Sequence, residues 1–107
     1  MTNIWVIESP VTQAEGEAIA YSIDFIGANS VSSVTAVCYK DNTDYSSSVF
    51  LSGDSIVISN NVITLKKLTA VADDGGSKYV VAVKGTVDGN TEIRKLLINV
   101  VDPSAEV

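Results

Sequence analysis

The feature that most constrains the fold of this chain is a strict alternation of apolar and polar residues. In residues 17–26, Ile19, Tyr21, Ile23 and Phe25 occupy every second position, and small, polar or acidic residues lie between them. A period of two places these four side chains on one face of a β-strand. No stretch keeps apolar residues at helical spacing for three turns. The chain is therefore expected to be all-β.

The same pattern recurs along the whole chain and predicts seven to eight strands. Besides 17–26, strands are expected at residues 4–8, 31–40, 45–51, 55–59, 62–68, 78–87 and 90–101. Turn residues separate them about every ten residues, and Asp88-Gly89 predicts a type I′ hairpin because both positions tolerate positive φ. This spacing favours an antiparallel β-sandwich. We expect one domain over residues 1–107, with a core sandwich at about 4–101 and a short tail at 102–107.

Composition excludes several function classes. Seven Lys and Arg stand against thirteen Asp and Glu, which gives a net charge of −6 and argues against nucleic acid as a partner. The chain has no histidine, the commonest general base and metal ligand. No Ser-x-x-Lys motif on a helix and no phosphate-cradling glycine loop is present. We therefore expect no enzymatic activity and no cofactor.

The ends and apolar runs of the sequence carry no targeting signal. No apolar run approaches the ~20 residues of a membrane span. The first residues lack the basic region and small-residue cleavage site of a secretory signal.

The single cysteine, Cys38, cannot form an internal disulfide. Because Cys38 alternates with Val34 and Ala36, we expect a buried small apolar side chain rather than a reactive thiol.

Several segments resemble immunoglobulin-like domains. Residues 34–41, Val-Thr-Ala-Val-Cys-Tyr-Lys-Asp, are similar to the third strand of that fold, with Cys38 where a core tryptophan usually lies. Residues 63–65 and Leu68, followed by Asp74, Gly76 and Tyr79, resemble its passage into the tyrosine corner. The resemblance covers about residues 17–101. It implies an immunoglobulin-like antiparallel β-sandwich without a disulfide, in which the Tyr79 hydroxyl turns back to loop backbone near Asp74.

The disulfide positions of that fold are occupied by other residues in this chain. Val81 stands where the second cysteine is usual, and Ile19 or Tyr21 stands at its partner position. The resemblance therefore implies that apolar packing alone holds the two sheets together.

Three segments also look similar to small immunoglobulin-like structural proteins of phage virions, namely residues 39–44, 61–65 and 79–81. The sequence begins and ends within a few residues of the first and last expected strands, which favours a free-standing component. This resemblance implies a capsid-decoration or tail-associated protein, assembled in the host cytoplasm and located in the virion. Its partners would be other virion proteins, further copies of itself, or both.

The outward face of three neighbouring strands is the candidate interface. Alternation places Tyr79 and Val81 inward on 78–87, so that the intervening residues point outward. The same reasoning on 31–40 and 90–101 collects one apolar patch, and exposed patches of several hundred Å² usually mark interfaces. The predicted interface residues are Val37, Tyr39, Val80, Ile93 and Leu97.

Acidic loops are the one metal candidate. The end of 31–40 and the start of 78–87 should meet at one pole, which would gather Asp41, Asp44, Asp73 and Asp74. The loop that carries Glu15 and Glu17 should join them. Carboxylates from several loops can hold Ca²⁺, but aspartate is also a residue that turns demand.

Two functions follow from these observations. The first is a non-enzymatic structural or assembly protein that acts through protein–protein contacts, and the second is a recognition module that binds a cell-surface glycan or protein through its loops. For the second, Tyr45 and the serines at 46–48 would supply aromatic and hydroxyl contacts. Trp5 offers the one large stacking surface, although it lies in a segment expected to pack.

Overall fold

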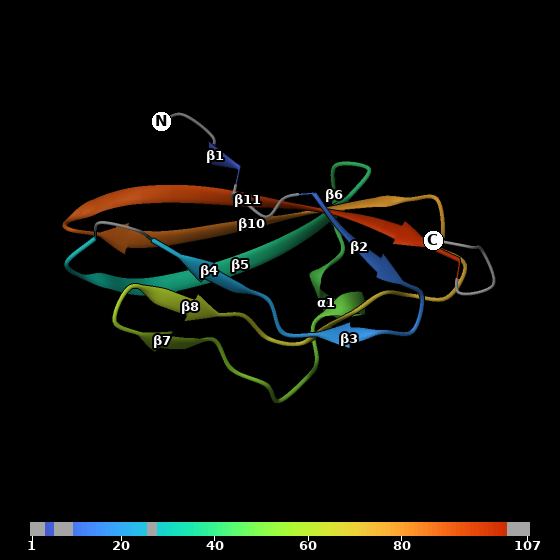
Figure 1. The fold of residues 1–107 in the computed structure, drawn as a ribbon, viewed down its shortest axis with the longest axis horizontal. Helices are drawn as coiled ribbons and strands as arrows, with labels where there is room; N and C mark the ends of the chain where they lie inside the picture. Colours follow the sequence, from blue (N-terminus) through green and yellow to red (C-terminus); the bar gives the residue numbers. More distant parts are fainter. Residues whose placement is uncertain (1–3, 6–9, 26–27, 103–107) are drawn as a thin grey trace.

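The computed structural model describes residues 4–5, 10–25 and 28–102, and shows two facing layers of β-strands (Figure 1). The side chains of residues 4–5 are not described. The elements in chain order are β1 (Ile4–Trp5), β2 (Val11–Ala14), β3 (Ala18–Ile19), β4 (Ser22–Asp24), β5 (Val31–Lys40), β6 (Thr43–Asp44), α1 (Ser46–Val49), β7 (Val57–Ser59), β8 (Val62–Thr64), β9 (Leu68–Thr69), β10 (Lys78–Val87) and β11 (Asn90–Val101).

The larger layer is a sheet in the order β1-β11-β10-β5-β6, with β2 also paired to β11. Its central strand, β10, is antiparallel to both neighbours, and Val81 lies opposite Leu96 on one side and Cys38 on the other. The N-terminal strands β1 and β2 both run parallel to β11. In this layer the three long strands β5, β10 and β11 form a continuous central platform.

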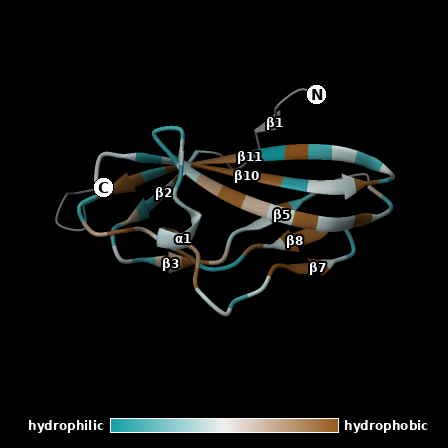
Figure 2. Ribbon diagram, turned by 180° about the vertical axis from the view of Figure 1, so that it is seen from behind, coloured by the Kyte–Doolittle hydropathy of each residue, from teal (hydrophilic) through white to brown (hydrophobic). Residues whose placement is uncertain are grey.

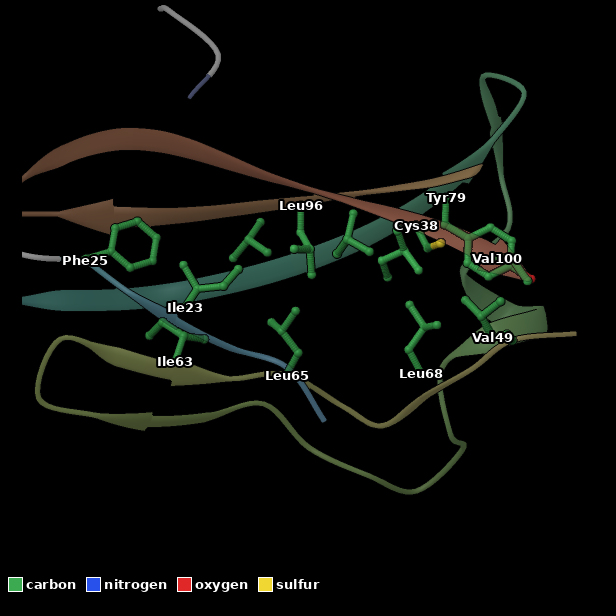
Figure 3. Packing of buried hydrophobic residues seen from close by; sticks show 14 of the residues in the cluster. Ile23, Phe25, Cys38, Val49, Ile63, Leu65, Leu68, Tyr79, Leu96 and Val100 are labelled. Atoms are coloured by element: carbon green, nitrogen blue, oxygen red, sulfur yellow. The ribbon is translucent and has the colours of Figure 1, made fainter. Parts of the chain in front are cut away.

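The second layer contains the pairs β3-β9 and β4-β8-β7. Ile23 of β4 lies opposite Ile63 of β8, and both side chains are fully buried. Figure 3 shows the side chains of the two layers meeting between the sheets. The buried apolar core consists of Ile23, Phe25, Val31, Cys38, Val49, Ile63, Leu65, Leu68, Ala70, Tyr79, Val81, Val83, Val87, Leu96, Ile98 and Val100.

The structure confirms the bounds that the alternation predicted for the long strands 31–40, 78–87 and 90–101. Asp88 and Gly89 have φ of 49° and 86°, as the type I′ hairpin between β10 and β11 requires. The inward phase of 17–26 is also confirmed at Ile23 and Phe25. That segment is divided into β3 and β4, however, and residue 26 lies outside the described residues.

The strand predicted at 45–51 is wrong, because residues 46–49 form the short helix α1. The Asp44 side chain accepts a hydrogen bond from the Ser46 amide at 3.0 Å, which favours a turn at this point. The turn buries Val49 in the core. No helix in residues 4–5, 10–25 and 28–102 is long and apolar enough to span a membrane.

The N-terminal and middle strands also differ from their predicted limits. Of the strand expected at 4–8, Ile4–Trp5 is β1, and residues 6–9 lie outside the described part. The strand expected at 55–59 is shortened to β7, and that expected at 62–68 is divided into β8 and β9. Sequence reasoning missed β2, because its four residues, Val-Thr-Gln-Ala, place a glutamine on the inward side.

That glutamine, Gln13, connects the two layers. Its side chain is fully buried, and its amide Nε2 donates to the carbonyl oxygens of Glu17 (2.6 Å) and Leu68 (2.8 Å). The Tyr21 hydroxyl donates to Gln13 Oε1 at 2.6 Å. A buried amide is stable only when its polar atoms have partners. This network therefore joins β2 of the larger sheet to the smaller layer through hydrogen bonds.

The tyrosine corner implied by the resemblance is confirmed. Tyr79 is fully buried, and its hydroxyl donates to Asp74 Oδ2 at 2.5 Å and accepts from the Val71 amide at 3.1 Å. Lys40 Nζ lies 2.6 Å from Asp74 Oδ1. Burial by itself would raise the pKa of Asp74, but the hydrogen bonds from Lys40 and Tyr79 outweigh it and hold that pKa below its ordinary value.

Cys38 is fully buried, as the alternation predicts. Burial, with smaller contributions from Asp44 and Asp74, raises the pKa of the Cys38 thiol to about 12. A thiol with this pKa carries almost no thiolate at neutral pH and is therefore chemically inert in the folded protein.

Substitution of Tyr79 tests the corner. In Tyr79→Phe the Asp74 carboxylate and the Val71 amide each lose a partner in a buried setting, which should lower the free energy of unfolding by about 1–3 kcal/mol. Urea denaturation measures this loss. The matched control Tyr39→Phe removes a hydroxyl from an exposed ring and should leave stability unchanged. Equal stability of the two variants would contradict the role of the corner.

The Asp74 pKa predicts how stability depends on pH. Because the folded-state pKa is lowered from its ordinary 3.8, the carboxylate contributes its full stabilisation above that value. The contribution is lost as the pH falls through the folded-state pKa. Wild-type protein should therefore lose more stability between about pH 5 and pH 2 than the isosteric variant Asp74→Asn. Parallel pH profiles of the two proteins, followed by thermal denaturation, would refute this.

Candidate functional site

The candidate site is the outer face of β11, β10 and β5, which points away from the core. Residues alternate along β10, with Tyr79, Val81 and Val83 buried and the residues between them outward. Strand pairing aligns the outward residues in three rows across the sheet. The rows are Tyr39–Val80–Leu97, Val37–Ala82–Lys95 and Thr35–Lys84–Ile93.

The structure places all five predicted interface residues on this face. Tyr39 is 38% exposed, whereas Val37, Val80, Ile93 and Leu97 are half-buried. Neighbouring side chains on adjacent strands lie close enough to shield one another. Leu97 and Lys95 also take part in further interactions. The face is therefore a closely packed surface rather than five separately exposed apolar residues.

A shallow groove of about 700 Å³ runs across this face. It includes three of the predicted side chains, Tyr39, Val80 and Ile93, and its floor continues over Ala82. Lys78 and Lys95 border it, together with Asp41 and Asn42 at the tip of the β5–β6 hairpin. Its size lies within the range of protein binding sites.

The face is less apolar than the sequence analysis predicted. Lys78, Lys84 and Lys95 lie on it, which is three of the seven cationic residues of the chain. Figure 2 shows apolar and polar residues alternating in bands along the strands of this sheet. The same alternation places Lys78 and Lys95 outward, so they were recognisable in the sequence. The surface is an apolar centre with lysines around it.

The acidic residues proposed for calcium have other roles. Asp41 (φ 52°) and Asp73 (φ 72°) occupy turns. Asp44 accepts from the Ser46 amide, which lowers its pKa, and Asp74 is paired with Lys40 and Tyr79. In the parts of the chain that the structure describes, no three Asp, Glu, Cys or His side chains gather closely enough to hold a metal ion.

The two glutamates expected at this pole also act on nearby backbone. Glu15 Oε2 accepts from the Gly75 amide at 2.7 Å, and Glu17 Oε1 accepts from the Ala14 amide at 2.8 Å. Each of these carboxylates orders a loop, which is the turn-forming role weighed against calcium in the sequence.

The aromatic loop proposed for glycan contacts is largely used within the fold. The centroids of the Tyr45 and Tyr79 rings lie 5.8 Å apart, and Lys40 Nζ lies 5.1 Å from the centroid of the Tyr45 ring. The Ser46 hydroxyl accepts from the Cys38 amide at 2.9 Å. The side chain of Trp5 lies outside the described residues. Of the residues predicted to contact a glycan, Ser47 and Ser48 are exposed on the surface.

A second groove, of about 770 Å³, was not predicted from the sequence. It runs beside β5, between Val34 and Ala36 on one side and Phe50, Leu51 and Ile56 on the other. Its far wall depends on the path of the chain after α1. Because that segment was predicted to be a strand, no sequence signal indicated the groove.

Comparison with known proteins bears on the fold. No protein-family model and no curated protein matches this chain. Solved structures with a similar arrangement include a twitchin kinase fragment from C. elegans, described as an autoregulated protein kinase with immunoglobulin domains. It is 17% identical with a TM-score of 0.50, and the match covers 90% of this chain and 20% of that one.

Two other solved structures are similar at lower scores. A chimeric titin Z1Z2 protein is 15% identical, with a TM-score of 0.49 and coverage of 92% of this chain and 88% of that one. An endo-fucoidan hydrolase is 17% identical, with a TM-score of 0.46 and coverage of 94% and 12%. This chain thus spans about a fifth of the twitchin fragment. Strand order, tyrosine corner and structural likeness agree: the fold is an immunoglobulin-like antiparallel β-sandwich without a disulfide.

Proposed function

We propose that this protein is a non-enzymatic assembly protein that binds other protein subunits through the outer face of β11, β10 and β5. The assembly we propose is a phage virion, in which the protein is a capsid-decoration or tail-associated component assembled in the host cytoplasm. The assignment to a virion is supported by the resemblance of residues 39–44, 61–65 and 79–81 to small phage structural proteins.

The observation that carries the proposal is the order of the outer face. Three strands of fixed register present an apolar centre at Tyr39, Val80 and Leu97, with a groove of about 700 Å³ across the sheet. A sheet surface whose strands are held in fixed register loses little conformational entropy on binding. An apolar centre with a charged rim is the arrangement found in protein–protein interfaces.

Charge supports a second copy of the chain as a partner. The face carries Lys78, Lys84 and Lys95, while the whole chain carries a net charge of −6. A lysine-bordered face on one copy is therefore complementary to acidic surface on another. Complementary charge accelerates association and selects the orientation of binding. Other virion proteins with acidic surfaces would satisfy the same requirement.

Two features of the chain support a role without catalysis. It has no histidine, and its only thiol is buried with a pKa of about 12. The side chains of Glu15, Asp44 and Asp74 are committed to hydrogen bonds and an ion pair within the fold. The glycan-recognition alternative has weaker support, because Tyr45 and Ser46 are already engaged with neighbouring residues.

Measurement of solution mass tests this function. Across a tenfold range of concentration, light scattering after size exclusion should give the wild-type protein a mass that is a multiple of 11.3 kDa. Leu97→Asp places a charge in the apolar centre of the outer face and should return the mass to 11.3 kDa. Lys84→Glu should weaken assembly and remove part of its salt dependence.

The matched control is Val57→Asp, which introduces the same charge at an exposed apolar residue of the smaller layer. It should assemble like the wild type. Thermal denaturation of each variant establishes that it is folded. A folded Leu97→Asp with unchanged assembly mass, or a wild-type protein that stays at 11.3 kDa throughout, would refute the proposal.

A further inference from the structure

The second groove adjoins a sheet edge that is largely unpaired. β5 pairs with β10 along its length, but on its other side pairing with β6 is limited to Tyr39 and Lys40. An unpaired edge strand presents backbone donors and acceptors to any extended chain that lies beside it. This is a property of the edge of the sheet and is separate from the outer face.

The direction of the unpaired backbone groups follows from Cys38. Its carbonyl accepts from the Tyr45 amide at 2.7 Å and its amide donates to the Ser46 hydroxyl at 2.9 Å, so both groups point away from β10. In a strand, residues two apart direct their backbone groups to the same side. The N–H and C=O of Ala36 therefore point into the groove, where residues 10–25 and 28–102 provide no hydrogen-bond partner.

The edge carries one of the features by which proteins usually block such sites, a bulge confined to the start of the strand. Natural edge strands carry lysine, proline or bulges that prevent pairing with another chain. Residues 31–37, Val-Ser-Ser-Val-Thr-Ala-Val, contain no charge and no proline. The one irregularity is at the start, where Ser33 has φ of 53° and the register with β10 shifts between Lys84 and Thr86. The open part is the regular stretch at 35–37, which contains Ala36.

The far wall of the groove is held in place by the smaller layer. Phe50 forms a β-bridge with Leu68, and the Leu51 amide donates to the Lys67 carbonyl at 2.9 Å. The Asp54 carboxylate accepts from the Lys67 amide at 2.8 Å. Leu51 is 49% exposed on this wall. The groove is thus a slot between the edges of the two layers.

We propose that this slot binds an extended segment of a partner polypeptide, which adds as a strand to the edge of β5. The N–H and C=O groups of Ala36 would form two backbone hydrogen bonds with it, and alternate apolar side chains of the segment would contact Phe50, Leu51 and Ile56. Addition of a strand derives affinity from the main chain and specificity from pockets for alternate side chains. The wall at 50–56 favours a single narrow strand over a second whole domain.

A synthetic peptide provides the probe. Acetyl-Ser-Val-Thr-Val-Thr-Val-Ser-amide has extended propensity, apolar side chains at alternate positions and no charge. Titration into ¹⁵N-labelled protein should shift the amide resonance of Ala36 more than those on the outer face. The same peptide with N-methylated valines cannot donate from those positions and should bind about tenfold more weakly or worse.

Two variants of the protein test the two parts of the slot. Ala36→Pro removes an N–H that no bond of the fold uses, so the melting temperature should change little while peptide affinity falls about tenfold. Leu51→Asp leaves the edge intact and removes an apolar contact, and should also weaken binding. Val57→Asp, at a residue that is 56% exposed and does not line the groove, is the matched control and should bind like the wild type.

Several outcomes would overturn this inference. These are no binding of the peptide at millimolar concentration, equal binding of the N-methylated peptide, or affinity of folded Leu51→Asp equal to that of the wild type. Self-association that is lost in Ala36→Pro and retained in Leu97→Asp would show that a second copy occupies the edge instead. The proposed assembly function is refuted by a different result, an unchanged assembly mass in folded Leu97→Asp. Failure of that function and failure of peptide binding are therefore distinguishable.

Discussion

The structure depends above all on the pairing of β10 with β11 and β5. Because β10 lies between two antiparallel neighbours, its register determines which side chains of all three strands enter the core. A shift of one residue would exchange Val81 and Val83 for Val80 and Ala82 at the core face. Tyr79 would leave the corner at the same time. The residues that form the core, the tyrosine corner and the outer face therefore all depend on the register of β10.

Two buried polar groups add directional bonds to a sandwich that has a single cysteine: Gln13 joins the two layers, and Asp74 ties the loop before β10 to the larger sheet. Gln13 reaches from β2 to the carbonyl oxygen of Leu68, and Asp74 collects Tyr79 and Lys40 at the start of β10. The resemblance to disulfide-free domains implied that apolar packing alone would hold the two sheets together. The structure adds hydrogen bonds that apolar packing cannot supply, and these bonds are directional, so they select one arrangement of the loops around them.

The outer face and the slot beside β5 differ in what they offer a partner. The outer face presents side chains from three strands, centred on Tyr39 and Val80, and suits a broad surface of another subunit. The slot beside β5 presents the backbone groups of Ala36 and suits one extended segment. Because Val37 and Ala36 point to opposite sides of the same strand, both surfaces could be occupied together.

Features that follow from local rules were predictable from the residues alone. Alternation placed β5, β10 and β11 and their inward residues, and Asp88-Gly89 indicated a hairpin through its tolerance of positive φ. The remaining features also depend on contacts between segments that are distant in the sequence. Residues 46–49 became helical because Asp44 accepts from Ser46 while Val49 is buried, and neither contact is visible in a pattern of polarity. Likewise the slot exists only because β6 stops pairing after two residues and the chain crosses to the other layer, a path set by long-range packing.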